Sequence, residues 1–275
     1  MRRPVLLWIL SFVITVASGV YQRLTGPSYP LSGTVVFEKQ PLRYRFDRSH
    51  PEVSDHSVEL TGVSQPARAV LEWRRHKTGE SWREVPMERS GDTLRALLPM
   101  QPPAGKLEYR VWLAGTRDSL MLPEEDPVVI RFTGEVPTGI LLLHVVAMFG
   151  GMLLSTRTGV EAFAAAPRFD RFVPWTLGFL LVGGFVLGPI MQKYAFGEFW
   201  TGWPFGHDLT DNKTLVAILA WVGAAVAVVR RGSARTWVIV AALVTLVIFL
   251  IPHSLLGSEF DYGGSQTDTP PGSVN

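Results

Sequence analysis

The sequence predicts a multi-pass α-helical membrane bundle into which an exported all-β immunoglobulin-like sandwich is inserted. Three observations support this fold class: several uncharged apolar runs, a central segment of alternating apolar and polar residues, and a composition with 47% hydrophobic but only 18% charged residues. Average soluble domains contain about 25% charged residues. A wholly soluble chain of 275 residues is therefore not expected.

Charge and cysteine content exclude several function classes. The 26 basic and 24 acidic residues give a net charge of only +2, so we expect no nucleic acid partner. The absence of cysteine rules out disulfides, thiolate metal sites, iron–sulfur clusters and cysteine nucleophiles. Gly-x-Ser-x-Gly, His-Glu-x-x-His and Walker-type spacings do not occur either. We therefore expect binding rather than catalysis.

Five uncharged runs approach the roughly 20 apolar residues that cross a hydrocarbon core of about 30 Å. They are residues 4–20, 138–155, 174–192, 214–229 and 236–252. The amino-terminal segment, residues 1–20, is either a transmembrane anchor or a cleaved signal peptide, because its apolar run follows two arginines and ends in small residues. In both cases we expect the segment that follows to be exported from the cytoplasm.

Arginines in short loops predict the orientation of the bundle. One consistent threading places all of them on the same side, which we assign to the cytoplasm: Arg2, Arg3, Arg157, Arg168, Arg171, Arg230, Arg231 and Arg235. The protein is then expected in a bacterial inner membrane, with residues 21–137 and the loop 193–213 on the periplasmic side. Within the four later runs only His144 can titrate, so ion transport is not favoured.

Residues 21–137 carry the pattern of half-buried strands joined by turns. Ala69, Leu71 and Trp73 share one face of a strand, and two later stretches repeat this alternation. Seven or more such strands predict the immunoglobulin-like sandwich, without its usual disulfide. We expect this domain to contact exported or membrane protein partners. The basic stretch 74–77 within it is expected to be a charged strand end.

Residues 138–262 are expected to form a four-helix bundle in contact with the lipid bilayer, followed by a disordered tail, residues 263–275. Its loop 193–213 contains six aromatic residues: Tyr194, Phe196, Phe199, Trp200, Trp203 and Phe205. Glycines in this loop would let the backbone approach a bound group closely. His144 and His253 flank the loop at the same membrane face, an arrangement that suits a haem with axial histidine ligands.

This order of features resembles the cytochrome c assembly family of haem-handling membrane proteins, which carry a tryptophan-rich outer loop, the WWD domain, between flanking histidines. The resemblance spans residues 138–262 and rests on three stretches: Leu141–Val146, Ala195–Trp200 and His253–Gly257. The contiguous Trp-Asp-Pro core of the family is missing here.

The resemblance implies a bound haem b and a role in haem handling or cytochrome assembly. His144 and His253 would be the axial ligands of the iron. Trp200, Trp203 and Asp208 would belong to the loop that faces the haem.

Copper is the alternative cofactor. His144, Met148 and Met152 recur every four residues and so share one helix face. Imidazole and thioether ligands suit Cu(I). Met191 and His207 could complete the set, although methionines also serve as gap-fillers between helices and His207 could be an exposed loop residue.

A third interpretation is an accessory or adaptor subunit without a cofactor. In that case His144 would form a hydrogen bond across the bundle. Asp208, Asp211 and Asn212 would fix the outer loop and cap the helix that follows it.

Overall fold

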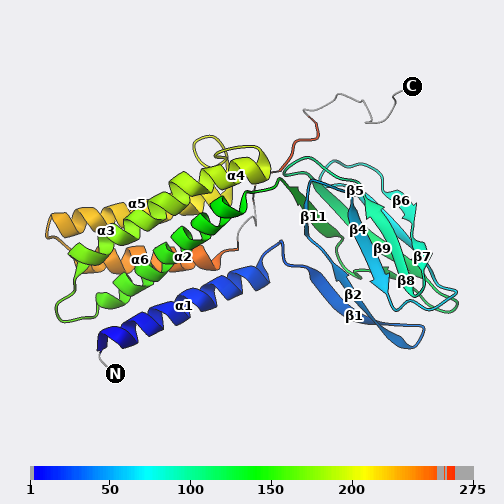
Figure 1. Ribbon diagram of the computed structural model, residues 1–275, viewed down its shortest axis with the longest axis horizontal. Coiled ribbons are helices and arrows are strands. Elements are labelled where there is room, and N and C mark those ends of the chain that lie inside the picture. Colours follow the sequence, from blue (N-terminus) through cyan, green and yellow to red (C-terminus); the bar gives the residue numbers. More distant parts are fainter. Residues whose placement is uncertain (1–2, 253–256, 258, 264–275) are drawn as a thin grey trace. The chain divides into compact units, whose positions relative to one another are not determined.

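The computed structural model describes residues 3–252, 257 and 259–263 and divides the chain into two compact units (Figure 1). Among the described residues, the helical unit comprises 3–29, 135–252 and 257, and the β domain comprises 30–134 together with 259–263. Each unit has a hydrophobic core of its own.

The helical unit begins with α1 (Arg3–Thr25) and resumes after the β domain. Its later helices are α2 (Thr138–Glu161), α3 (Phe169–Leu180), the π-helical segment η1 (Leu181–Leu187), α4 (Gly188–Phe196), α5 (Leu209–Val229) and α6 (Ala234–Leu250). The elements α3, η1 and α4 follow one another without a break, so they form one long helix with a π-helical middle.

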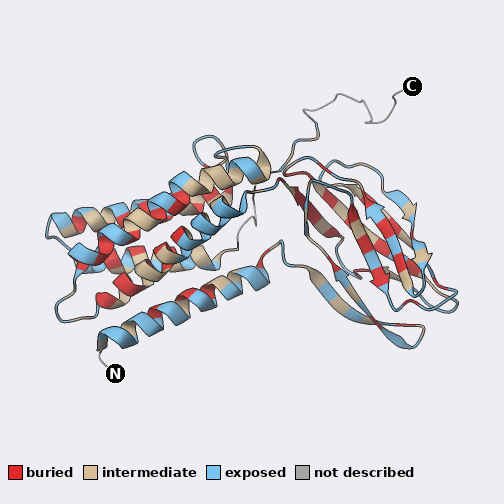
Figure 2. Ribbon diagram, in the orientation of Figure 1, coloured by how far each residue is buried: buried red, intermediate tan, exposed pale blue. Residues whose placement is uncertain are grey.

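Four helical stretches in the described part of the chain are long and apolar enough to cross a membrane: Pro4–Thr25, Thr138–Glu161, Phe169–Phe196 and Leu209–Val229. The fifth expected span corresponds to α6, which has only 17 residues. Large apolar side chains such as Leu142 and Leu219 are about 60% exposed on these helices. Figure 2 shows many exposed positions along the helices in pale blue. Exposing such large apolar surfaces to water is unfavourable, whereas they can contact the hydrocarbon chains of lipids. The helices therefore indicate membrane association.

The helices also bury charged groups near their ends, outside the uncharged runs in which only His144 can titrate. Arg157 and Glu161 of α2 are 1% and 4% exposed, and Arg157 Nη1 lies 2.6 Å from Glu161 Oε2. Lys213 of α5 is buried and donates a hydrogen bond of 2.9 Å to the Ile251 carbonyl at the end of α6. Because both helices extend beyond their uncharged runs, the extra turns bring these residues inside the bundle.

The β domain contains eleven strands within its described residues, which exceeds the expected minimum of seven. They are β1 (Leu31–Phe37), β2 (Gln40–Phe46), β3 (Ser49–Pro51), β4 (His56–Thr61), β5 (Arg68–Arg75), β6 (Arg83–Pro86), β7 (Glu88–Ser90), β8 (Thr93–Leu98), β9 (Lys106–Ala114), β10 (Ser119–Leu122) and β11 (Val128–Thr133).

These strands form three sheets. The largest has the order β3-β11-β9-β5-β6, with β10 also paired to β9; a second sheet has the order β4-β8-β7, and β1 pairs with β2. Ala69, Leu71 and Trp73 of β5 are buried, which confirms the predicted alternation. Buried residues from all three sheets join one core, so the sheets pack against one another around it.

The described residues 259–263, which follow the last helix, belong to the β domain and not to the helical unit. The predicted division had ended the bundle at residue 262. The difference arises because the side chains of Glu259 and Tyr262 form hydrogen bonds with Lys77, Gln101 and Lys106 of the β domain.

Candidate functional site

A pocket of about 230 Å³ lies in the helical unit among α2, the end of η1, α4 and the start of α5. It is lined by His144, Met148, Gly184, Gly188, Met191, Gln192, Ala195, Phe196, Asp208, Thr210, Asp211 and Thr214. Two of the predicted site residues, His144 and Asp208, therefore lie at one pocket although they are distant in the sequence. Six of the twelve lining residues are polar: His144 from α2, Gln192 from α4, and four from the N-cap and first two turns of α5.

The His144 imidazole forms a hydrogen bond across the bundle, as the adaptor interpretation expects, and this bond orients the ring. Its Nδ1 lies 3.0 Å from the Gly183 carbonyl oxygen. A carbonyl oxygen only accepts hydrogen bonds, so Nδ1 must carry the proton and the neutral ring keeps a lone pair on Nε2. Nε2 has no hydrogen-bond partner among the described residues. Metal-binding histidines commonly have this arrangement, in which a hydrogen bond at one ring nitrogen fixes the tautomer and the other nitrogen can bind the metal.

The π-helical segment makes this contact possible. The Gly183 carbonyl accepts a hydrogen bond from the Gly188 N–H, five residues further along, and the His144 ring donates to the same oxygen. Gly183 has no side chain, and a Cβ there would lie 2.7 Å from Met148 Sδ and 3.1 Å from Ala147 Cβ. Gly183 therefore lets α2 approach closely enough for His144 to reach the backbone of η1.

The outer loop is held by the first turn of α5, as the adaptor interpretation expected. Asp211 Oδ2 accepts hydrogen bonds from the backbone N–H groups of Thr201 (2.7 Å) and Gly202 (3.0 Å). Asn212 Oδ1 accepts one from the Trp203 N–H at 2.7 Å. Asp208 caps α5 by accepting from the Thr210 N–H. The two carboxylates are thus engaged with the backbone, which accounts for their burial.

The two loop tryptophans differ in their environments. Trp200 stacks on Phe185 with ring centroids 5.4 Å apart, and its indole N–H donates to the Trp203 carbonyl at 3.1 Å. Trp203 itself is 67% exposed. Neither ring lines the pocket, so the structure does not group these two residues with His144 and Asp208 as the haem hypothesis expected.

The residues predicted to bind copper do not all lie together in the structure. Met148 and Met191 line the pocket together with His144. Met152 is only 1% exposed and is not part of the pocket lining. His207 is an exposed loop residue. Of the residues predicted for copper, three are therefore brought together and two are not.

The second predicted axial ligand, His253, lies outside the described residues. Within the described ranges, no group of three or more His, Cys, Asp or Glu side chains is placed to hold a metal ion.

Gln192, Thr210 and Thr214 also line the pocket, and the sequence interpretation did not select them. Gln192 donates to the Thr201 hydroxyl at 2.6 Å and so connects α4 to the loop. The sequence does carry a signal for the irregular helix turn that His144 contacts. It is the Gly183-Gly184 pair shortly before Pro189, because glycine pairs and a proline without an N–H favour such a turn.

Comparison with known proteins finds no matching family model, no matching curated protein and no matching solved structure.

Proposed function

We propose that this protein is an integral membrane protein whose helical unit binds a metal centre through Nε2 of His144. The supporting observation is the hydrogen bond from Nδ1 to the Gly183 carbonyl, which leaves Nε2 as the ring atom with an available lone pair. The pocket that His144 lines then supplies the space and the remaining ligands.

Copper(I) is the metal that the described donors suit best. The pocket combines the His144 imidazole with the thioethers of Met148 and Met191. Soft thioether sulfur favours Cu(I) over harder divalent ions. Binding of a single ion also agrees with the volume of about 230 Å³, which lies below the roughly 300–1,000 Å³ of pockets that enclose organic cofactors.

Haem b is the second candidate. Its aromatic surface would be the stacked pair of Trp200 in the loop and Phe185 in η1, which lies outside the pocket that His144 lines. The pocket as described does not enclose a porphyrin, so haem would need the loop to move outward and His253 to supply the second ligand. We expect this role only if both histidines bind the same iron.

We further propose that the helices cross a bacterial inner membrane several times, with the β domain and the loop 193–213 on the exported side. The four long apolar helices and the positions of the arginines support this topology. The packing of three sheets around one core supports an immunoglobulin-like sandwich, a class of domain that often contacts other proteins.

Metal analysis of the purified full chain tests the proposal. The detergent-solubilised protein is loaded with Cu(I) under ascorbate, or with haem, and bound metal is measured by mass spectrometry and absorbance. For copper, we expect His144→Gln and Met148→Leu each to weaken binding at least tenfold. Met152→Leu is the matched control, because Met152 lies on the same helix outside the pocket, and it should bind as the native chain does.

For haem, a Soret band should weaken in both His144→Gln and His253→Ala and persist in Met148→Leu. A chain that binds neither copper nor haem, or whose binding ignores His144→Gln, contradicts the proposal. That result would leave the accessory or adaptor subunit as the remaining interpretation.

A further inference from the structure

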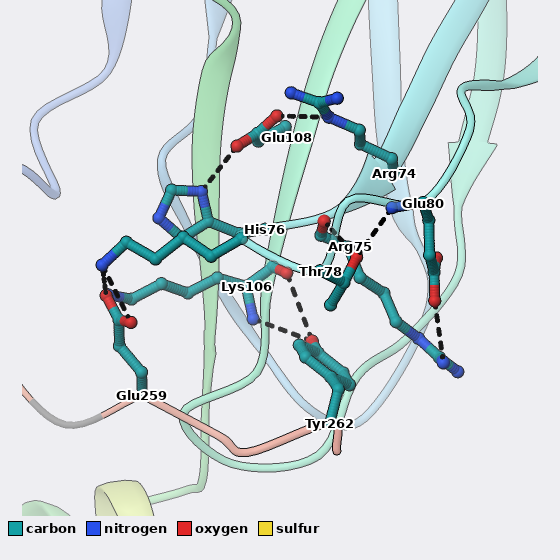
Figure 3. A network of polar contacts seen from close by, with 10 residues as sticks. Arg74, Arg75, His76, Thr78, Glu80, Lys106, Glu108, Glu259 and Tyr262 are labelled. Carbon is teal, nitrogen blue, oxygen red and sulfur yellow. Dashed lines mark hydrogen bonds and ion pairs between the residues drawn. The ribbon is translucent and has the colours of Figure 1, made fainter.

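The described residues 259–262, which follow the last helix, lie on the β domain in a dense set of polar contacts. Figure 3 shows Glu259 and Tyr262 reaching the loop after β5 and the start of β9. The segment reads Glu-Phe-Asp-Tyr, so its two main contact residues are three positions apart. The backbone takes part as well, because the Phe260 N–H donates to the Ala104 carbonyl at 3.2 Å.

Glu259 bridges two lysines of the β domain. Its carboxylate accepts hydrogen bonds from Lys77 Nζ at 2.9 and 3.0 Å and from Lys106 Nζ at 2.7 Å. The Lys106 side chain is only 14% exposed, so its ammonium group depends on this carboxylate for compensation. Burial alone would raise the pKa of Glu259, but the hydrogen bonds from Lys106 and Lys77 lower it to about 2.

Tyr262 is recognised by groups that match both its hydroxyl and its ring. The hydroxyl accepts from the Lys106 backbone N–H at 3.0 Å and lies 3.1 Å from Gln101 Oε1, to which it can donate. The Arg75 guanidinium lies 5.0 Å from the ring centroid, and the Phe260 ring packs edge-on at 5.2 Å. A Cβ at Gly105 would lie 2.7 Å from Gln101 Cβ, 2.8 Å from the Pro102 carbonyl oxygen and 3.0 Å from this hydroxyl, so the turn itself requires a glycine there and the hydroxyl approaches the same space.

The other charges of this surface are already paired within the β domain. Arg74 and His76 both contact Glu108, at 2.6 and 2.8 Å, and Arg75 contacts Glu80 at 3.3 Å. Lys77 and Lys106 have no carboxylate partner other than Glu259 among the residues that the structure describes. Lys106 is thus the largely buried charge of this surface that needs an acidic partner, and the mostly exposed Lys77 adds a second contact to the same carboxylate.

We propose that this surface, formed by Lys77, Gln101, Gly105 and Lys106 with Arg75, is a peptide-binding site of the β domain for extended Glu-x-x-Tyr segments. The chain's own residues 259–262 occupy it as a releasable strap, and a partner protein that carries such a segment displaces them. A tethered segment experiences an effective concentration of roughly millimolar. The strap therefore excludes weak competitors while the individual contacts remain reversible.

Peptide binding to the full chain in detergent tests this inference. The probe is the fluorescein-labelled peptide Gly-Ser-Glu-Phe-Asp-Tyr-Gly, and the readout is fluorescence anisotropy. In the variant Glu259→Lys/Tyr262→Ala the site is vacated, and we expect it to bind the peptide at least tenfold more tightly than the native chain. The control variant Glu125→Lys makes the same charge change at an exposed position and should behave as the native chain does.

Two further changes locate the site. Adding Lys106→Met to the vacated variant, or replacing the glutamate of the peptide by glutamine, should weaken binding at least tenfold. Equal binding by the native and vacated chains, or binding that ignores both changes, overturns the inference.

If the vacated variant does not fold, hydrogen exchange of the Phe260 backbone amide in the native chain tests the same inference. The Phe260 amide should be protected in the free chain and should exchange faster when unlabelled peptide is added at millimolar concentration. Exchange of this amide at the rate of a free peptide, or protection that added peptide never reduces, would equally contradict a releasable strap.

Discussion

The His144 imidazole and the Gly183 carbonyl oxygen are joined by a 3.0 Å hydrogen bond that connects α2 to the π-helical segment η1. This bond determines which ring nitrogen carries the proton. It also depends on a glycine, because a Cβ at position 183 would collide with the side chain of Met148. If His144 binds a metal, we therefore expect metal binding to depend on Gly183, although this residue would not contact the metal.

Gly183→Ala should destabilise the helical unit and abolish metal binding. The added Cβ would lie 2.7 Å from Met148 Sδ, and overpacking of this kind costs about 1–3 kcal/mol. Thermal unfolding in detergent and metal content are measured together. Gly178→Ala is the control, because a Cβ there meets no atom within 4 Å, and it should leave both properties unchanged or raise the stability slightly. Normal metal binding by Gly183→Ala would contradict the orienting role of this contact.

Breaking the ion pair of Arg157 and Glu161 should destabilise the protein strongly. Both side chains are buried, their atoms approach to 2.6 Å, and the Arg157 guanidinium also lies 4.8 Å from the Phe172 ring centroid. Removing one member of a buried pair costs about 3–5 kcal/mol, and without Arg157 the buried Glu161 carboxylate would keep Arg168, whose side chain is 53% exposed, at 3.6 Å. Arg157→Met is therefore expected to lower the unfolding temperature markedly in a detergent melt.

The matched changes distinguish pairing from packing. Arg157→Met/Glu161→Met removes both charges and should recover most of the lost stability. Arg168→Met removes a half-exposed arginine 3.6 Å from the same carboxylate and should cost less than about 1 kcal/mol. If the double variant is as unstable as Arg157→Met, the contact with aromatic rings and not the ion pair would account for the effect.

The β domain should lose stability in mild acid because of a histidine pair. Nδ1 of His56 lies 3.2 Å from Nδ1 of His50, and His56 is only 6% exposed. Burial lowers the pKa of His56 below its ordinary value of 6.5, and the neighbouring His50 lowers it further, while Asp47 acts in the opposite direction. The unfolded chain then binds more protons than the folded one below pH 6.5, so stability falls as the pH drops through that value.

Melting curves at pH 7.5 and 5.5, followed through tryptophan fluorescence, measure this effect. His56→Gln should reduce the difference between the two pH values, whereas His207→Gln, a change at an exposed loop histidine, should not. Glu259 does not interfere in this range, because its contribution is complete above pH 4.5 and is lost only as the pH falls towards about 2. An equal pH response in His56→Gln and the native chain would refute the assignment.

Local patterns predicted the elements well because each depends on neighbouring residues. The alternation of Ala69, Leu71 and Trp73 is enough to define a strand with one buried face, and the structure buries all three. The apolar runs located the helices for the same reason. The boundaries were less accurate, since α2 continues through Arg157 to Glu161, whose charges pair with each other one turn apart within the helix.

The candidate site was only partly predictable, because it depends on which helices become neighbours. Sequence spacing correctly placed His144 and Met148 on one face of a helix, but it also selected Met152, which the bundle buries elsewhere. Met191 joins His144 only through the packing of α4 against α2. Trp203 was selected through the family resemblance, yet this residue is exposed.

The sequence by itself determined that the chain combines apolar helices with a β domain and has no cysteine chemistry, because composition and periodicity are local properties. Only the tertiary structure decided that the His144 ring bonds to Gly183, that Asp211 holds the loop backbone, and that residues 259–262 return to the β domain. These contacts join residues far apart in the chain or require a backbone geometry that no single segment prefers. Their formation depends on close packing between elements, which local sequence patterns do not encode.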